Sequence, residues 1–174
     1  SHSSDTSEYR LQTRRYMRHK LPEIRTNRLS IRLLDPVEAP KILRFRQENR
    51  DHLQRWEPLR MPEFFTESFW EIQLRLCLRD YRDGVSTCFA LLSPEEDEVM
   101  GVCNYTSIIK GTFQSTHLGY AMAAKHEGKG IMREALIKTN RYMFEQKGLH
   151  RIMAAYLPIN ARSGKLLNNL GFEK

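Results

Sequence analysis

Residues 114–136, QSTHLGYAMAAKHEGKGIMREAL, decide the fold. Gln114 to Met122 is predicted to be a strand, and Lys125 to Gly130 a glycine-containing loop. Ile131 to Lys147 is predicted to be a helix that stops at Gly148. The side of this helix that we expect to face the core carries Met132, Ala135, Leu136, Thr139, Met143 and Phe144. A strand, a glycine loop and a helix therefore follow one another directly.

The glycine loop has the chemistry of an anion site. A helix N-terminus offers unpaired backbone N–H groups and the positive end of the helix dipole. Gly128 and Gly130 let the backbone approach a ligand closely, and Lys129 and Arg133 add positive potential. The loop lacks the Gly-Lys-Ser/Thr of a Walker loop and the third glycine of a dinucleotide-binding fingerprint. Either it binds phosphate within another fold, or its glycines serve the turn geometry alone.

The chain before residue 85 predicts one strand and two helices. The strand covers 29–33, and Asp35-Pro36 fits the N-cap and first position of a helix that runs to Asn49. A second helix is predicted over 67–82, where Ser68 and Glu71 fit a capping box. The buried side of the second helix is expected to carry Trp70, Leu74, Cys77 and Tyr81.

The remaining elements complete a mixed sheet. Strands are predicted at 85–92 and 99–108, which form an antiparallel meander with 114–122. The acidic turn 93–98 is expected to be solvated. A strand at 151–157 and a short helix that ends at Leu170 follow the glycine loop and its helix. The order of elements predicts an α+β domain with a central sheet and flanking helices.

Composition excludes several classes of protein. The 174 residues are 28% charged and 40% hydrophobic, which is typical of one globular domain and not of a disordered chain. No apolar run approaches the roughly 18 residues of a membrane helix, so no membrane partner is expected. The widely spaced Cys77, Cys88 and Cys103 favour free thiols in a reducing compartment over a disulfide framework or a zinc site. We therefore expect a cytoplasmic protein without a bound metal.

Several segments together resemble a known family. The pattern Pro158-x-Asn160-x-x-Ser163-x-x-x-Leu167-x-x-x-Gly171-Phe172 and the glycine loop resemble the GNAT acetyltransferases. More narrowly, the chain resembles the ribosomal-protein-alanine N-terminal acetyltransferases of the RimJ/RimL type. The segments that fit this branch are Trp56-Glu57-Pro58, Leu118-Gly119-Tyr120, Gly128-Lys129-Gly130 and Arg151-Ile152-Met153-Ala154. The resemblance covers about residues 24–174.

The resemblance implies a GNAT fold with an acetyl-CoA site between two splayed strands. In this family the backbone of the loop, here Lys125 to Gly130, holds the coenzyme A pyrophosphate. Pantetheine lies between the strand that ends at Met122 and the strand that ends at Leu157, and a backbone N–H near Ala121 or Met122 polarises the thioester carbonyl. The coenzyme contacts implied are Tyr120, Ala121, Met122, His126, Glu127, Gly128, Lys129, Gly130, Ile131, Asn160 and Ser163. Acetyl-CoA is the implied cosubstrate, and no metal is needed.

This sequence departs from the general family pattern at the first residue of the loop and at the usual position of the catalytic general acid. Lys125 opens the loop where Gln or Arg is usual, and Leu167 stands where many GNAT enzymes carry a tyrosine that protonates the departing thiolate. We therefore expect Ser163, the RimL-type alternative, to be the general acid or the hydrogen-bond donor to the thiol, and Asn160 to contact coenzyme A. The alternative is that Asn160 and Ser163 only cap the last helix.

The general base is left open by the sequence. Glu57, His117, Tyr105 and a water molecule are the candidates, because an α-amine with a pKa of about 8 needs only modest help. We favour Glu57, since a carboxylate also anchors an incoming ammonium group.

The function expected is transfer of an acetyl group to the N-terminal α-amine of a protein, namely an alanine-starting ribosomal protein. The alternatives are a small-molecule acetyltransferase for a polyamine or antibiotic, and a ribosome- or RNA-binding module with a vestigial acetyl-CoA site. The net charge is +7, and residues 1–23 are expected to form a basic arm that contacts the ribosome ahead of a GNAT domain at 24–174. We also expect the natural chain to continue past Lys174 with a further strand or strands.

Overall fold

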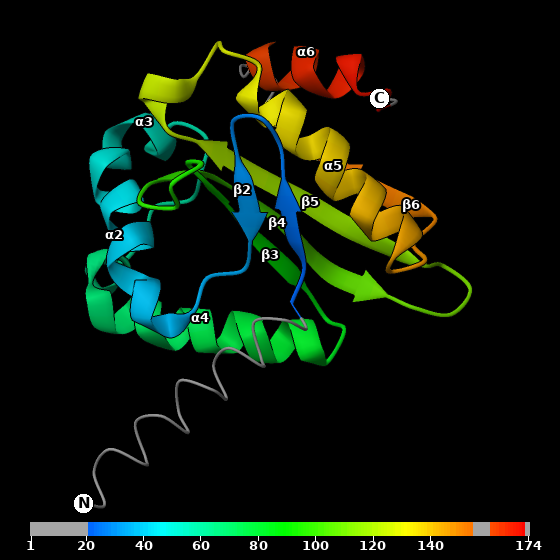
Figure 1. The fold of residues 1–174 in the computed structure, drawn as a ribbon, viewed down its shortest axis with the longest axis horizontal. Helices are drawn as coiled ribbons and strands as arrows, with labels where there is room; N and C mark the ends of the chain where they lie inside the picture. Colours follow the sequence, from blue (N-terminus) through cyan, green and yellow to red (C-terminus); the bar gives the residue numbers. More distant parts are fainter. Residues whose placement is uncertain (1–20, 155–160, 173–174) are drawn as a thin grey trace, which may run out of the picture.

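The computed structural model describes residues 21–154 and 161–172, which form one mixed sheet with helices on both faces (Figure 1). The six strands in this part of the chain lie in sequence order. They are β1 (Glu23–Arg25), β2 (Ser30–Arg32), β3 (Thr87–Leu92), β4 (Val99–Ile109), β5 (Ser115–Met122) and β6 (Arg151–Ala154). Neighbouring strands are antiparallel from β1 to β5, and β6 is parallel to β5. The predicted meander and the predicted mostly antiparallel sheet are confirmed.

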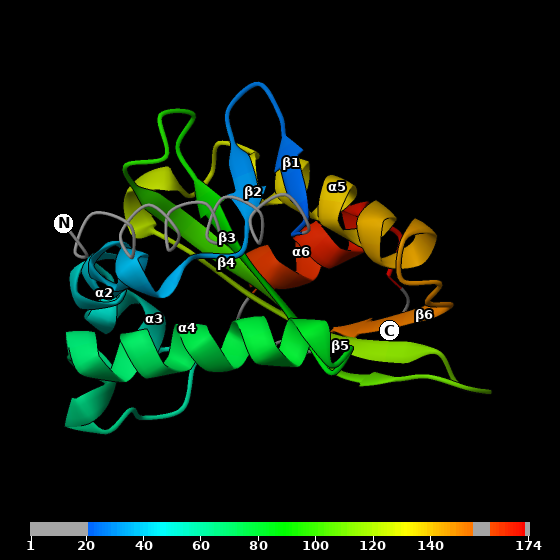
Figure 2. The same cartoon turned by 60° about the horizontal axis from the view of Figure 1, so that its bottom comes forward.

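The helices divide between the two faces of the sheet (Figures 1 and 2). One face is covered by α2 (Ala39–Glu48) and α4 (Glu67–Arg82), with the short α3 (Arg50–Gln54) beside α2. The other face is covered by α5 (Ile131–Glu145), and α6 (Ala161–Asn169) lies near its N-terminal end. Three 3₁₀ turns, at Pro36–Glu38, Pro62–Phe65 and Ala124–His126, connect the described elements.

Two hydrophobic cores result from the alternation of side chains along the strands. Phe89 and Leu91 of β3 belong to the core under α5, whereas Ala90 and Leu92 belong to the core under α2 and α4. The helix residues in the α5 core are Ile131, Met132, Ala135, Leu136 and Met143. This matches the predicted side of the helix except for Phe144, which is 43% exposed.

Local signals in the sequence account for most helix boundaries. Asp35 caps the turn at Pro36–Glu38 and forms a capping box with Glu38, and α4 covers the predicted 67–82. The predicted capping box at Ser68 is wrong, because the N-cap is Thr66, whose side chain accepts a hydrogen bond from the Phe69 N–H. The elements β1 and α3 were not predicted, since three and five residues are too few to show a period. In addition, β1 starts at Glu23, the last residue of the expected basic arm.

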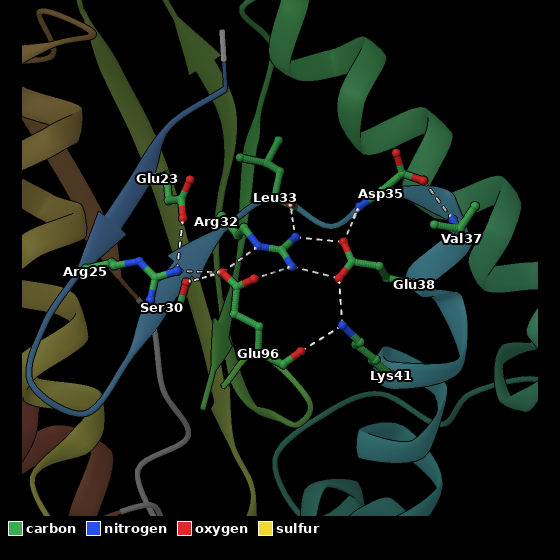
Figure 3. Close-up of polar contacts among 10 residues, drawn as sticks. All are labelled: Glu23, Arg25, Ser30, Arg32, Leu33, Asp35, Val37, Glu38, Lys41 and Glu96. Carbon is green, nitrogen blue, oxygen red and sulfur yellow. Dashed lines mark hydrogen bonds and ion pairs between the residues drawn. The ribbon is translucent and has the colours of Figure 1, made fainter. Parts of the chain in front are cut away.

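The acidic turn between β3 and β4 is tied to the sheet by a buried arginine (Figure 3). Arg32 on β2 binds the carboxylate of Glu38 through two hydrogen bonds of 2.7 and 2.8 Å, and its Nε lies 3.2 Å from Glu96 in the turn. Ser30 donates to Glu96 at 2.6 Å, and Lys41 donates to the Glu96 carbonyl oxygen at 2.7 Å. The expectation that this turn is solvated holds for the exposed Pro94, Glu95 and Asp97, but it is wrong for Glu96, whose carboxylate neutralises the buried Arg32.

This network makes stability depend on acidic pH. Burial alone would raise the pKa of Glu38, but hydrogen bonds from Arg32, the Asp35 backbone and Lys41 outweigh it and lower the pKa from the ordinary 4.5 to about 2. The ionised form is thus the one that the fold stabilises. Its contribution is complete above about pH 4.5 and is lost as the pH falls toward 2.

We predict that Glu38→Gln lowers the free energy of unfolding at pH 7 by about 3 kcal/mol, because the buried Arg32 loses its main partner. The difference between parent and variant should shrink as the pH falls from about 4.5 to about 2. Urea denaturation across this pH range measures both effects. Glu145→Gln, which removes an exposed helical ion pair with Arg141, is the matched control and should change stability by less than about 0.5 kcal/mol. An equal effect of the two variants would contradict the assignment.

Candidate active site

A cavity of about 590 Å³ opens where the C-terminal end of β5 meets the glycine loop. Its walls come from four segments: the α3 region, the end of β5, the loop with the first turn of α5, and α6. Nearly every predicted site residue in the described chain lines it, namely Glu57, Tyr120, Ala121, Met122, His126, Glu127, Gly128, Gly130, Ile131 and Ser163. Lys129 is not among the lining residues, and Asn160 lies outside the described residues.

The pairing of β5 explains why the cavity borders its last residues. The parallel ladder with β6 runs from Ser115↔Arg151 to Leu118↔Ala154, whereas the antiparallel ladder with β4 continues to Met122. Tyr120 to Met122 therefore extend beyond the described part of β6 and border the cavity. The continuation of the last strand over 155–157, where the splay was predicted, lies outside the described residues.

The loop backbone has the conformation that an anion site needs. Gly128 and Gly130 have φ angles of +75° and +73°, in the left-handed region that favours glycine. Gly130 is the N-cap of α5 and makes no side-chain cap hydrogen bond. A Cβ at Gly128 would meet no atom within 4 Å, so that side of the loop is open. Since Gly130 has no side chain, no N-cap side chain bonds to the N–H groups of the first turn of α5 where this turn meets the cavity. Arg133 adds positive charge at the cavity wall.

The first half of the loop is fixed by the acidic turn. Glu98 accepts hydrogen bonds from Lys125 at 2.6 Å and from the His126 ring at 3.1 Å. These two partners outweigh the opposing effect of burial and lower the pKa of Glu98. The Lys125 ammonium group and the His126 ring are thereby bonded to protein. The backbone N–H groups of His126 and Glu127 are bonded to protein as well, because they donate to the carbonyl oxygens of Ala123 and Ala124, so these donors are not available to a ligand.

Three further contacts fix the loop from other elements. Asn49, at the end of α2, accepts a hydrogen bond of 2.9 Å from the Ala124 N–H. His52 on α3 lies 2.7 Å from the carboxylate of Glu127. From the opposite side Arg28, between β1 and β2, donates to the Lys129 carbonyl oxygen at 2.7 Å and forms an ion pair of 3.0 Å with Glu134 on α5. Sequence reasoning missed these contacts, because each joins residues at least 75 positions apart.

Two hydroxyl groups meet at the α6 wall of the cavity. The Tyr120 hydroxyl on β5 forms a short hydrogen bond with Ser163 Oγ, and lies 3.4 Å from the Ser163 carbonyl oxygen. Both side chains are half-buried. Leu167, one turn further along α6, is only 4% exposed and packs in the interior. The position where many family members carry a tyrosine is thus a packing position in this chain.

Glu57 is held at the cavity wall by a buried arginine. Both carboxylate oxygens accept hydrogen bonds from Arg46, at 3.1 and 3.0 Å, and Arg60 lies 3.7 Å away. The Arg46 side chain is 7% exposed and lies between three aromatic rings, those of Phe45, Phe64 and Trp70. Burial lowers the pKa of its guanidinium, and Glu57 partly offsets this effect. Arg46 therefore fixes the position of the Glu57 carboxylate. Glu57 lines the cavity, whereas its partners Arg46 and Arg60 line a neighbouring pocket that Glu57 also borders.

The other two side chains considered as the base lie elsewhere. His117 is exposed on β5 and is not among the residues that line the cavity. The Tyr105 hydroxyl is buried against Thr139 at 2.8 Å and Asn140 at 2.5 Å, and burial raises its pKa well above the ordinary value. Of the three, Glu57 is the one that the cavity includes.

The comparison with known families identifies the class of protein. The sequence profile described as "Acetyltransferase (GNAT) domain" matches residues 28–173. The chain therefore belongs to the GNAT acetyltransferases, and it is an N-acetyltransferase that uses acetyl-CoA as its cosubstrate. The loop fits this cosubstrate, because its two positive-φ glycines and the helix N-terminus provide donors for a pyrophosphate. The predicted GNAT fold is confirmed.

Particular relatives narrow the comparison to one branch. The chain is 40% identical over 159 residues to the ribosomal protein uS5-alanine N-acetyltransferase of Escherichia coli (strain K12), covering 90% of this chain and 82% of that enzyme. The structure of ribosomal-protein-S5-alanine acetyltransferase from Vibrio fischeri matches with a TM-score of 0.85 and 35% identity, over 88% of this chain and 84% of that one. Mycobacterium smegmatis RimJ in complex with CoA-disulfide matches with a TM-score of 0.78, at 24% identity over 88% and 75% of the two chains. At 24% identity, that last match shows the fold alone.

The described residues contain neither a cluster of metal ligands nor a membrane-spanning helix. Residues 21–154 and 161–172 contain no group of three or more His, Cys, Asp or Glu side chains that could hold a metal ion. Within the same residues, no helix is long and apolar enough to span a bilayer.

We predict that Gly128→Asp weakens acetyl-CoA binding at least tenfold, because it places a carboxylate beside the phosphates. The left-handed φ should also lower stability by about 1 kcal/mol. Isothermal titration calorimetry and urea denaturation measure the two quantities. Gly148→Asp is the matched control, since Gly148 has a φ of +64°, equal open space and a position outside the cavity lining. It should show a similar loss of stability and unchanged affinity, and equal affinities of both variants would remove the loop from the binding site.

Proposed function

We propose that this enzyme acetylates the N-terminal α-amine of a protein, and that its acceptor is a ribosomal protein that begins with alanine. Support comes from the 40% identity over 90% of the chain to an enzyme named for acetylating ribosomal protein uS5 at alanine. The structural observation that carries the proposal is that the glycine loop and Glu57, whose carboxylate Arg46 fixes, line the same cavity of about 590 Å³. Such a cavity can hold a coenzyme and present an anion to an incoming amine.

On this proposal the loop and β5 bind the cosubstrate. Backbone N–H groups from Gly128 to Ile131, including that of Lys129, contact the pyrophosphate. His126 and Glu127 line the cavity and contact the coenzyme through other groups, because their own N–H groups donate to Ala123 and Ala124. Asn160 contacts the coenzyme as well. A backbone N–H at Ala121 or Met122 donates to the thioester carbonyl oxygen and stabilises the negative charge that develops there. The position of Tyr120 to Met122 at the cavity, beyond the described pairing with β6, supports this assignment.

Glu57 and Ser163 act on the two ends of the reaction. Glu57 accepts a hydrogen bond from the amine and takes its proton, directly or through water, as the nitrogen bonds to the acetyl carbon. The carbon–sulfur bond then breaks, and Ser163 donates a hydrogen bond or a proton to the departing thiolate. Glu57 lines the cavity from the segment after α3, and Ser163 lines it from α6. This placement supports roles on the two sides of the acetyl group.

The wider setting follows from the proposed acceptor. Ribosomal proteins are made and assembled in the cytoplasm, so we place the enzyme there. A basic arm at residues 1–23 and an acetyltransferase domain at 24–174 are part of the proposal, with the arm contacting the ribosome.

The acceptor class is tested with three substrates and mass spectrometry. We expect acetylation of a peptide that begins with alanine, and none of the same peptide with a blocked α-amine and a free lysine. Transfer to spermidine or another small amine alone would contradict the proposal and favour a small-molecule acetyltransferase.

A second prediction concerns Glu57 and its buried partner. Glu57→Gln leaves Arg46 without its anion, so a loss of activity by itself is ambiguous. The double variant Arg46→Met/Glu57→Gln removes the unpaired charge and should recover most of the lost stability. We expect both variants to lower kcat/KM for the peptide by about a hundredfold while the acetyl-CoA Kd stays within about twofold. Parent-like kcat/KM in the double variant would exclude Glu57 from catalysis.

A further inference from the structure

The departing thiolate needs a proton donor that α6 does not supply at the usual position. Leu167 has no polar group and is 4% exposed. Ser163 faces the cavity from the same helix, but a serine hydroxyl is a poor acid without a partner that restores its proton. Whatever partner acts must therefore reach Ser163 from another element.

Tyr120 meets this requirement from β5. Its hydroxyl is hydrogen-bonded to Ser163 Oγ, and both residues line the cavity together with Ala121 and Met122. A phenol is far more acidic than an aliphatic alcohol, with an ordinary pKa near 10. The contact thus joins the more acidic hydroxyl to the one that we assign to the thiol, at the strand end where the thioester is proposed to lie.

Two other tyrosine contacts show that the arrangement is particular to the cavity. The Tyr81 and Tyr142 hydroxyls lie 2.7 Å apart, between α4 and α5, and neither residue lines the cavity. The Tyr105 hydroxyl is buried against Thr139 beneath α5. The hydroxyls of these two contacts are hydrogen-bonded within the protein and away from the cavity. The Tyr120–Ser163 pair, in contrast, lies at the cavity wall, where a ligand would bind.

We infer that Tyr120 supplies the proton of the leaving group, through Ser163. This inference rests on the role given to Ser163 in the proposed function. As the carbon–sulfur bond breaks, sulfur keeps the bonding electron pair and takes the hydroxyl proton of Ser163. The Ser163 oxygen takes the hydroxyl proton of Tyr120, and the resulting phenolate regains a proton from water. The amine proton leaves separately on the Glu57 side, so charge and protons balance over the cycle.

The first test needs no turnover and compares the Kd of coenzyme A with that of desulfo-coenzyme A by calorimetry. The parent should prefer coenzyme A about fivefold, because its thiol hydrogen-bonds to the hydroxyl pair. Ser163→Ala and Tyr120→Phe should each reduce this preference to less than about twofold. Tyr142→Phe, which also removes one hydroxyl of a tyrosine contact, should keep the parent preference. An unchanged preference in Tyr120→Phe would overturn the inference.

The second test is kinetic and uses the same variants. Tyr120→Phe should lower kcat at least tenfold with little change in the KM for acetyl-CoA, and Tyr120→Phe/Ser163→Ala should be no slower than the slower single variant. Tyr142→Phe should have the parent kcat. Independent, multiplying losses in the double variant would overturn the relay. If the parent acetylates only small amines, the proposed acceptor is wrong, while the coenzyme comparison still decides the role of Tyr120.

Discussion

The acidic turn between β3 and β4 carries the ion pairs on which the rest of the structure depends. Glu96 neutralises the buried Arg32 together with Glu38, and this joins the first strands to the start of α2. Two residues further on, Glu98 binds Lys125 and His126 at the start of the glycine loop. A loop with two glycines cannot hold its own shape, because glycine restricts the backbone so little. The turn supplies part of that restraint from outside the loop, together with Asn49, His52 and Arg28. One segment therefore contributes both to the electrostatics of the core and to the geometry of the loop.

Ion pairs within the fold account for part of the positive charge of the chain. Of the cations in the described chain, Arg28, Arg32, Arg46 and Lys125 are each bound to a carboxylate. Their charges hold strands, loop and cavity wall together. The buried Arg32 and Arg46 cannot form part of a surface for nucleic acid. Arg133 at the cavity wall remains close to where the coenzyme phosphates are proposed to lie.

How far the sequence predicts this molecule depends on the range of each interaction. Periodicity and capping residues are local signals, so α4, α5, the meander and the strand–loop–helix unit at 114–147 were predictable. The family resemblance then located nine of the eleven implied coenzyme contacts at one cavity, with Lys129 outside its lining and Asn160 outside the described residues. Arg46 under Glu57 and Tyr120 against Ser163 were not predictable, because partners 11 and 43 positions apart leave no periodic pattern. Likewise β1 and α3 depend on tertiary pairing more than on their own short sequences.

On the function proposed above, one cavity binds the coenzyme and the acceptor amine at the same time. A bisubstrate analogue, in which coenzyme A is joined through an acetyl bridge to the α-nitrogen of an alanine peptide, tests this directly by calorimetry. If both sites lie in the same cavity, the analogue should bind at least about a hundredfold more tightly than coenzyme A. An analogue that binds no more tightly than coenzyme A would contradict the account, because the peptide half would then find no site beside the loop.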